Sequence, residues 1–310
     1  MKRDVAIAVV MFAVLALLPL AGAAYWMRLG TIVLMYGVLA MSWNFIGGMA
    51  GYPSFAVAAF FGLGAYTGAV AQKFAVPMGL AWAAAGLLAL AFAALLGLAL
   101  LRLRGHYFAI ASLVVAEVLR ELVNSATELT GGGMGLNLPL PGMVSVDAQA
   151  RFFFYAMLAL AALTFAAMLL TAYSKLGFGL RCIKQNESAA DMLGVDTTFY
   201  KVSAFALSGV FVGVAGAVYA SWLHYIEPPD VFDVLYSVKA IVMVLLGGAG
   251  SVFGPLLGAA LFLSLEELVW RNYLEVHTGV LGLMIVLLVL FLPKGLLSLS
   301  RRLSRSSSAR

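Results

Sequence analysis

The chain has 310 residues, of which 64% are hydrophobic and 11% charged, and its formal net charge is +5 at pH 7. Soluble domains are about 45–50% apolar and about 25% charged, and a chain of this length cannot bury so much apolar surface in a soluble core. The composition excludes a soluble enzyme, a nucleic-acid-binding protein and a disordered chain, and it predicts a polytopic protein of the lipid membrane.

Apolar runs predict the membrane helices, because a helix needs about 20 apolar residues to cross a bilayer. In chain order the runs are 5–25, 30–47, 53–72, 77–101, 106–124, 151–173, 199–223, 236–247, 254–269 and 278–293. The runs 236–247 and 254–269 are short, so they also fit half-helices that meet at a re-entrant turn. The sequence predicts an all-α fold of about ten (8–10) transmembrane helices in one domain, 1–310.

The basic residues predict the orientation, because Lys and Arg concentrate in cytoplasmic loops. If the N-terminus is cytoplasmic, the inner loops contain Lys2, Arg3, Arg102, Arg104, Lys175, Arg181, Lys184, Lys201 and the basic tail 297–310. The outer loops then hold only four basic residues, Arg28, Lys73, Arg151 and Arg271, together with the acidic residues Glu128, Asp147, Glu227, Asp230, Asp233 and Glu275. We therefore expect both termini to lie in the cytoplasm.

The N-terminus also resembles a cleavable signal peptide, because Lys2 and Arg3 precede an apolar run that ends at Ala21-Gly22-Ala23. The run is longer than the apolar region of a usual signal peptide. The first span is also needed to keep both termini on one side. We therefore expect a retained first helix.

Two glycine-rich stretches resemble each other. The first reads Gly47-Gly48-Met-Ala-Gly51-Tyr-Pro53, and the second reads Gly247-Gly248-Ala-Gly250-Ser-Val-Phe-Gly254-Pro255. One interpretation is close helix packing, which small residues permit in membranes. The other is a duplicated fold with two broken helices along a path, which makes Gly247, Gly248 and Gly250 candidates for the translocation path.

Charged residues inside predicted spans are further candidates. Glu117, Arg120 and Glu121 are spaced so that Arg120 can pair with Glu117. A charge in lipid is costly, so the three residues are expected to line a translocation path or to form an ion pair near the outer end of the span. Lys239 is expected to extend toward the span end, and Glu266 and Glu267 to pair with Arg271 at the outer interface.

The longest inner loop, 174–198, carries the clearest pattern. Residues 181–193 suit one amphipathic helix with Ile183, Ala190 and Leu193 on one face, and Gly194 is a plausible helix stop. A compact helix of this kind suits docking into a groove of a soluble partner. Glu187 is expected either to cap backbone amides or to meet a basic residue of that partner.

Motifs of enzymes are missing from the sequence. It has no G-x-x-x-x-G-K-[ST] phosphate loop and no H-E-x-x-H, and its three histidines are far apart. We therefore expect no catalytic residue, no metal site and no cofactor in this chain.

Several ordered motifs resemble the LivM-type permease subunits of branched-chain amino acid ABC transporters. They are Leu103-Arg-Gly-His-Tyr-Phe-Ala109, Thr130-Gly-Gly-Gly-Met-Gly-Leu136, Gly177-Phe-Gly-Leu-Arg-Cys-Ile-Lys-Gln-Asn-Glu-Ser-Ala-Ala190, Lys201-Val-Ser-Ala-Phe-Ala-Leu-Ser-Gly209, Leu246-Gly-Gly-Ala-Gly-Ser-Val-Phe-Gly-Pro255 and Leu292-Pro-Lys-Gly-Leu296. The resemblance covers residues 30–296. His106 and Ser188 depart from the family pattern and leave the substrate branch open.

The resemblance implies a type II-like ABC importer permease with broken helices. It makes 174–198 an EAA-like coupling loop in which Glu187, Ala189, Ala190 and Gly194 contact the ATPase. It further implies a LivH-type sister permease, two cytoplasmic LivG/LivF-type ATPase subunits that carry ATP and Mg, and a periplasmic substrate-binding protein. Branched-chain amino acids, urea, short amides and aromatic acids all remain possible substrates.

An ion-coupled secondary transporter is the alternative function. Glu117, Arg120 and Glu121 would then be the coupling residues, and broken helices suit both functions. A secondary transporter has no need of an ATPase-docking loop, so the segment 174–198 favours the ABC permease.

Overall fold

The computed structural model describes residues 2–21, 24–103, 105–139, 145–272 and 282, and the regular secondary structure in these ranges is helical apart from one pair of two-residue strands. The predicted span 278–293, Gly282 excepted, and the basic tail 297–310 lie outside the described residues. The all-α prediction is confirmed for the described part of the chain.

The first half of the chain forms the elements α1 (Lys2–Ala16), η1 (Leu18–Ala21), α2 (Ala24–Trp43), η2 (Asn44–Met49), α3 (Val57–Lys73), α4 (Met78–Leu100), α5 (His106–Ser125), α6 (Thr127–Thr130), η3 (Gly132–Met134) and β1 (Leu136–Asn137). The second half forms α7 (Val146–Tyr173), α8 (Lys175–Gln185), α9 (Glu187–Met192), α10 (Thr197–Leu223), β2 (Tyr225–Ile226), α11 (Pro228–Val231), α12 (Leu235–Gly247) and α13 (Gly254–Asn272). η2 is a π-helical continuation of α2.

The first nine predicted spans each correspond to a helix, with one correction. The run 5–25 is not a single helix, because α1 ends at Ala16 and a 3₁₀ turn that contains Pro19 follows. Proline lacks an N–H and clashes with the preceding turn, so a helix does not continue through it. Within the described ranges, four helices, Tyr25–Met49, Met78–Leu100, Val146–Tyr173 and Thr197–Leu223, are long and apolar enough to cross a membrane.

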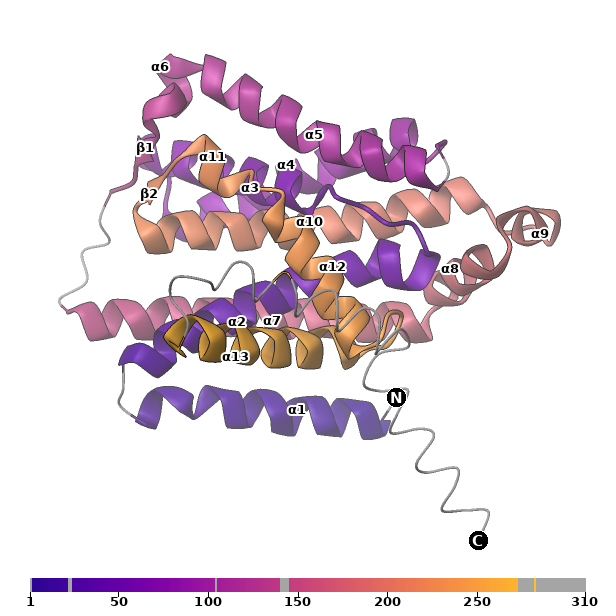
Figure 1. Cartoon of the computed structure of the whole chain (residues 1–310), viewed down its shortest axis with the longest axis horizontal. Coiled ribbons are helices and arrows are strands. Elements are labelled where there is room, and N and C mark those ends of the chain that lie inside the picture. The colour runs from indigo at the N-terminus through magenta and orange to yellow at the C-terminus, as the bar shows by residue number, and fades with distance from the viewer. Residues whose placement is uncertain (1, 22–23, 104, 140–144, 273–281, 283–310) are drawn as a thin grey trace, which may run out of the picture.

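The helices run back and forth between two ends of the molecule (Figure 1). At one end, which we call the α8–α9 end, Tyr173 donates to Asp4 of α1 over 2.5 Å. At the opposite end, the β1–β2 end, β1 pairs antiparallel with β2, and Lys73 donates to the carbonyls of Glu128 and Leu129. The segments predicted to share a side of the membrane therefore share an end of the structure.

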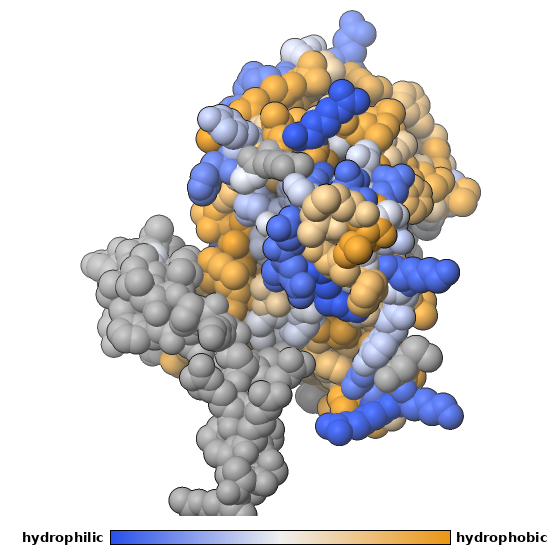
Figure 2. Space-filling view, turned by 90° about the vertical axis from the view of Figure 1, so that its right-hand side faces the viewer, coloured by the Kyte–Doolittle hydropathy of each residue, from blue (hydrophilic) through white to orange (hydrophobic). Residues whose placement is uncertain are grey.

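The α8–α9 end differs in polarity between its middle and its margin. Seen from the α8–α9 end, hydrophilic side chains gather over the middle of the face, and hydrophobic residues occupy much of its margin (Figure 2). Such an apolar margin is what a bilayer would surround.

The centre of the fold is the packing of α10 against α3 and α4. On α4 the buried face is a stripe of small residues, Ala81, Ala85, Ala89 and Ala93, each fully buried. The spacing of four places them on one side of the helix, and small side chains let two membrane helices approach closely. This packing holds α10 in place, and the loop before α10 carries the candidate site.

Candidate functional site

The loop between α7 and α10 contains two short helices, so the prediction of one helix over 181–193 is wrong. Asn186 separates α8 from α9 with an extended backbone, and its side chain accepts a hydrogen bond from the Ala189 amide over 3.1 Å. Asn is among the strongest N-cap residues, because its oxygen satisfies an amide that the helix leaves unpaired. Asn186, and not Glu187, is therefore the cap of α9.

α9 ends where the sequence predicts, at Gly194. This residue has a φ of +84° and follows the C-cap residue Leu193. The Gly194 amide donates to Asp191 O over 2.9 Å, and the Val195 amide donates to Ala190 O over 3.1 Å. This pair of bonds is a Schellman motif, in which glycine adopts the left-handed conformation at little cost.

The faces of the two helices differ in part from the prediction. Ile183 and Ala190 are buried, as expected, but Leu193 is 82% exposed because it follows the last helical residue and turns away. Met192 beside it is also 82% exposed. Ala189 is half-buried, and Ala190 is covered by this chain itself, so Met192 and Leu193 form the exposed apolar end of α9.

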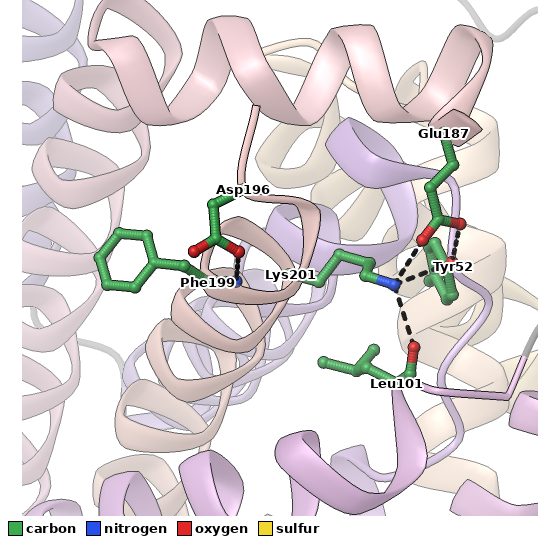
Figure 3. Close-up of polar contacts among 6 residues, drawn as sticks. All are labelled: Tyr52, Leu101, Glu187, Asp196, Phe199 and Lys201. Atoms are coloured by element: carbon green, nitrogen blue, oxygen red, sulfur yellow. Dashed lines mark hydrogen bonds and ion pairs between the residues drawn. The ribbon is translucent and has the colours of Figure 1, made fainter. Parts of the chain in front are cut away.

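A buried ion pair anchors α9 (Figure 3). Lys201 of α10 is 4% exposed, and its ammonium donates to Glu187 Oε1 over 2.6 Å, to Leu101 O over 3.0 Å and to the Tyr52 hydroxyl over 3.3 Å. The Tyr52 hydroxyl donates to Glu187 Oε2 over 2.5 Å. A lysine ammonium has three donors, and each of them has a partner here.

This Lys201 network joins four parts of the chain that are separate in sequence. They are α9, α10, the segment that follows η2, and the turn after α4. The sequence left open whether Glu187 caps amides or meets a base on a partner protein; in the structure Glu187 pairs with Lys201 of its own chain. The carboxylate thus holds the loop onto the membrane helices.

The two glycine-rich stretches meet next to this network. The Asn44 side chain donates to Ser251 O over 2.9 Å and accepts from the Gly250 amide over 2.8 Å. Gly250 has a φ of +81°, and a Cβ there would lie 3.0 Å from Gly48 O. Lys184 of α8 donates to the same Gly48 oxygen over 2.7 Å. Through Lys184, the loop 174–198 therefore contacts the point where the two glycine-rich stretches come together.

Gly247 and Gly248 lie at the turn between α12 and α13. These helices are antiparallel neighbours that share many contacts, and the Ser251 hydroxyl closes the turn by donating to Gly248 O over 2.6 Å. At about 1.5 Å per residue, the 13 residues of α12 extend about 20 Å. The two short runs, 236–247 and 254–269, form the separate helices α12 and α13, which are joined by a tight turn at the α8–α9 end.

Glu117, Arg120 and Glu121 lie on the exposed side of α5. Arg120 pairs with Glu117 and lies 3.7 Å from Glu121, and the side chains of the two glutamates are 57% and 62% exposed. The buried side of α5 carries Phe108, Ser112, Ala116 and Leu119 instead. The predicted ion pair is present, and within this chain the three residues face outward.

Lys239 and Glu266 form an ion pair that the sequence did not predict. Lys239 Nζ donates to Glu266 Oε1 over 2.6 Å and links α12 to α13. The carboxylate on the neighbouring helix holds the Lys239 ammonium, a contact that the predicted extension toward the span end did not include. No periodic signal connects positions so far apart in sequence, so only the packing of the two helices reveals the pair.

Long apolar helices that run back and forth between two ends of the described structure, with ion pairs between elements, define a multi-pass membrane protein. The chain belongs to the family described as "Branched-chain amino acid transport system / permease component", which matches residues 6–291. It is accordingly a permease component of a branched-chain amino acid ABC transport system, a transporter subunit and not an enzyme. The membership decides against the ion-coupled secondary transporter.

Relatives with established names agree with the family. The chain is 30% identical to "High-affinity branched-chain amino acid transport system permease protein LivM" of Salmonella typhimurium and of Escherichia coli, over 88% of this chain and 70% of each relative. It is 29% identical to the LivH permease protein of Escherichia coli over 43% of this chain and 44% of that protein. It is also 29% identical to "Autoinducer 2 import system permease protein LsrC" of Salmonella paratyphi B over 40% and 38%. No solved structure matches the chain.

Proposed function

We propose that the chain is the LivM-type half of a heteromeric ABC importer in a bacterial inner membrane, with a type II-like fold of about ten spans. Both termini and the α8–α9 end face the cytoplasm in this proposal. The described basic residues Lys2, Arg102, Lys175 and Lys184 support it, because they flank that end and positive charge marks the cytoplasmic side.

The exposed charges of α5 support a sister permease of the LivH type. Apolar side chains that share this face with the charges, such as Ile110 and Val114, would suit lipid, but Glu117, Arg120 and Glu121 would not. A second permease against this face would give the charges a protein or water environment. The translocation path would then run between the two permeases, with α5 at its edge.

The 174–198 loop is proposed to dock on one of two ATPase subunits. The observation that carries this proposal is the exposure of Met192 and Leu193, both 82%, on a loop that is otherwise tied down through Glu187 and Lys184. An anchored loop with an apolar tip presents a preorganised surface, which lowers the entropic cost of binding. Motion of the ATPase would reach the helix breaks through the same anchors.

The solute is proposed to be a branched-chain amino acid that a periplasmic binding protein delivers. The names of the two LivM relatives support this choice, and they cover most of the chain. The likeness to the autoinducer 2 permease covers less than half of it.

Co-purification tests the docking. The permease, its sister permease and the two ATPases are expressed together, with Leu193→Glu compared with Met134→Glu. Met134 is 87% exposed but lies at the β1–β2 end, so it is a matched control. Leu193→Glu is expected to reduce ATPase recovery roughly tenfold or more, because it places a charge in an apolar contact. Equal ATPase recovery with both variants would contradict the docking.

A further inference from the structure

A cavity of about 280 Å³ lies between α2, α10, α12 and α13, apart from the coupling loop. A second hollow of about 250 Å³ shares Tyr36, Tyr219, Tyr236 and Lys239 with it and reaches Asp230 and Asp233 at the β1–β2 end. Sites for drug-sized ligands have volumes of about 300–1,000 Å³, so this cavity suits a smaller solute.

The Lys239–Glu266 ion pair forms the charged wall of the cavity. Besides its 2.6 Å bond to Glu266, the Lys239 ammonium lies 5.4 Å from the centre of the Tyr36 ring. The other carboxylate oxygen, Glu266 Oε2, is buried and has no hydrogen-bond partner among the described residues. A buried acceptor without a partner is costly, and it is ready to accept a bond from a bound donor.

The remaining walls are aromatic and apolar. Tyr236 stacks on Tyr36 with ring centres 5.9 Å apart, and Tyr219 lies 6.4 Å from Tyr236. Aliphatic side chains complete the lining, among them Ile32, Met35 and Leu263. The cavity therefore offers one charge of each sign beside an apolar surface.

Carboxylates line both the cavity and the outer hollow. Asp230 and Asp233 line the outer hollow, and burial together with the neighbouring charges of Glu227 and Asp233 raises the pKa of Asp230. Glu267 also lines the cavity and accepts a hydrogen bond from the Tyr25 hydroxyl. A concentration of negative charge disfavours the entry of anions.

We propose that this cavity binds a zwitterionic amino acid with an aliphatic side chain, with its carboxylate on Lys239, its ammonium on Glu266 and its side chain against Ile32, Met35 and Leu263. The proposal rests on the proposed function and adds a substrate site within this chain. The bound zwitterion replaces one ion pair by two charge-assisted contacts and leaves no charge without a partner. A solute with one charge, or with none, would separate Lys239 from Glu266 without compensating both.

Thermal unfolding of the full permease–ATPase complex in nanodiscs, without the binding protein, measures this site directly. The probes are leucine, leucinamide, which lacks the carboxylate, and 4-methylpentanoate, which lacks the ammonium. A ligand that binds only the folded state raises the unfolding midpoint. At equal concentration, leucine is expected to raise the midpoint of the wild type more than either analogue, with an affinity roughly tenfold or more higher.

Three variants assign the charges, and Lys73→Gln at the β1–β2 end is the matched control. Lys239→Gln is expected to bind leucine and leucinamide equally, and Glu266→Gln to bind leucine and 4-methylpentanoate equally. The double variant Lys239→Glu/Glu266→Lys keeps an ion pair between the helices. It is expected to unfold close to the wild-type midpoint and to lose the leucine-induced shift. With the two protein charges exchanged, leucine could pair with both only by turning round, and its side chain would then point away from the apolar wall.

A purely structural role of the ion pair predicts different results. The single variants would then lower the midpoint without ligand yet keep the preference for leucine, and the double variant would keep the leucine-induced shift. Either result, or the absence of a shift in the wild type, overturns the proposal. Uptake of leucine by the wild-type complex with its binding protein is measured in parallel, and loss of that uptake would count against the proposed function instead.

Discussion

At the scale of residues, Lys201 shows how a charge is kept within a membrane helix bundle. Its side chain is 5% exposed, and Glu187, Leu101 and Tyr52 occupy all three of its donors. A buried pair of this kind adds little stability compared with an apolar replacement, but the loss of one partner leaves the other charge uncompensated. The contribution of the pair is therefore mainly to fix the position of α9.

Lys201→Met is expected to lower the free energy of unfolding by about 3–5 kcal/mol, because Glu187 stays buried without its counter-ion. Chemical denaturation of the purified permease in detergent measures the change. Lys175→Met is the control, since Lys175 is exposed at the same end. The double variant Lys201→Met/Glu187→Leu should recover part of the loss. A double variant less stable than Lys201→Met would contradict this account.

At the scale of elements, the turn between α12 and α13 is where two helix breaks are held in one position. Asn44 bonds to both sides of the turn, through the Gly250 amide and the Ser251 carbonyl. Lys184 of α8 binds the backbone on the other side of the contact, at Gly48 O. Lys184 therefore ties α8 to η2, and Asn44 ties η2 to the turn between α12 and α13.

Gly250→Val is expected to reduce uptake strongly, because a β-branched residue at a φ of +81° costs about 1–3 kcal/mol and its Cβ would crowd Gly48 O. Val242→Ala, a buried position within α12, is the matched control and should leave most uptake intact. Both proteins are compared for insertion and for solute uptake in cells. Equal, near-normal uptake would mean that the turn only connects two helices.

At the scale of the whole molecule, the sequence predicts the helices, which depend on local patterns of apolar residues. It does not predict the contacts that form only when the helices pack together. Runs of apolar residues locate nine helices among the described residues, and Gly194 marks the end of α9. The pairs Lys201–Glu187 and Lys239–Glu266 leave no local pattern, because their partners meet only when the helices assemble. For the same reason, helical spacing alone placed Leu193 on the same face as Ile183 and Ala190, whereas in the structure Leu193 is exposed.

The proposed orientation can be tested with an impermeant maleimide on a Cys182→Ala background. Met134→Cys, at the β1–β2 end, is expected to react in intact cells, and Ser188→Cys, at the α8–α9 end, only in inside-out vesicles without the ATPases. Both positions are exposed, so access depends on the side of the membrane. The reverse pattern would place the basic end outside and exclude ATPase docking there.

The small ladder of β1 and β2 has a consequence for biosynthesis. Leu136 pairs with Ile226, so the ladder cannot close until α7, the loop 174–198 and α10 have left the ribosome. Chains fold from the N-terminus during synthesis at about 5–20 residues per second, and until closure the backbone of β1 must rely on water for its hydrogen bonds. We therefore expect the segment from α6 to β1 to be among the last parts of the first half to become resistant to proteases. Pulse proteolysis of stalled nascent chains would detect when the ladder closes.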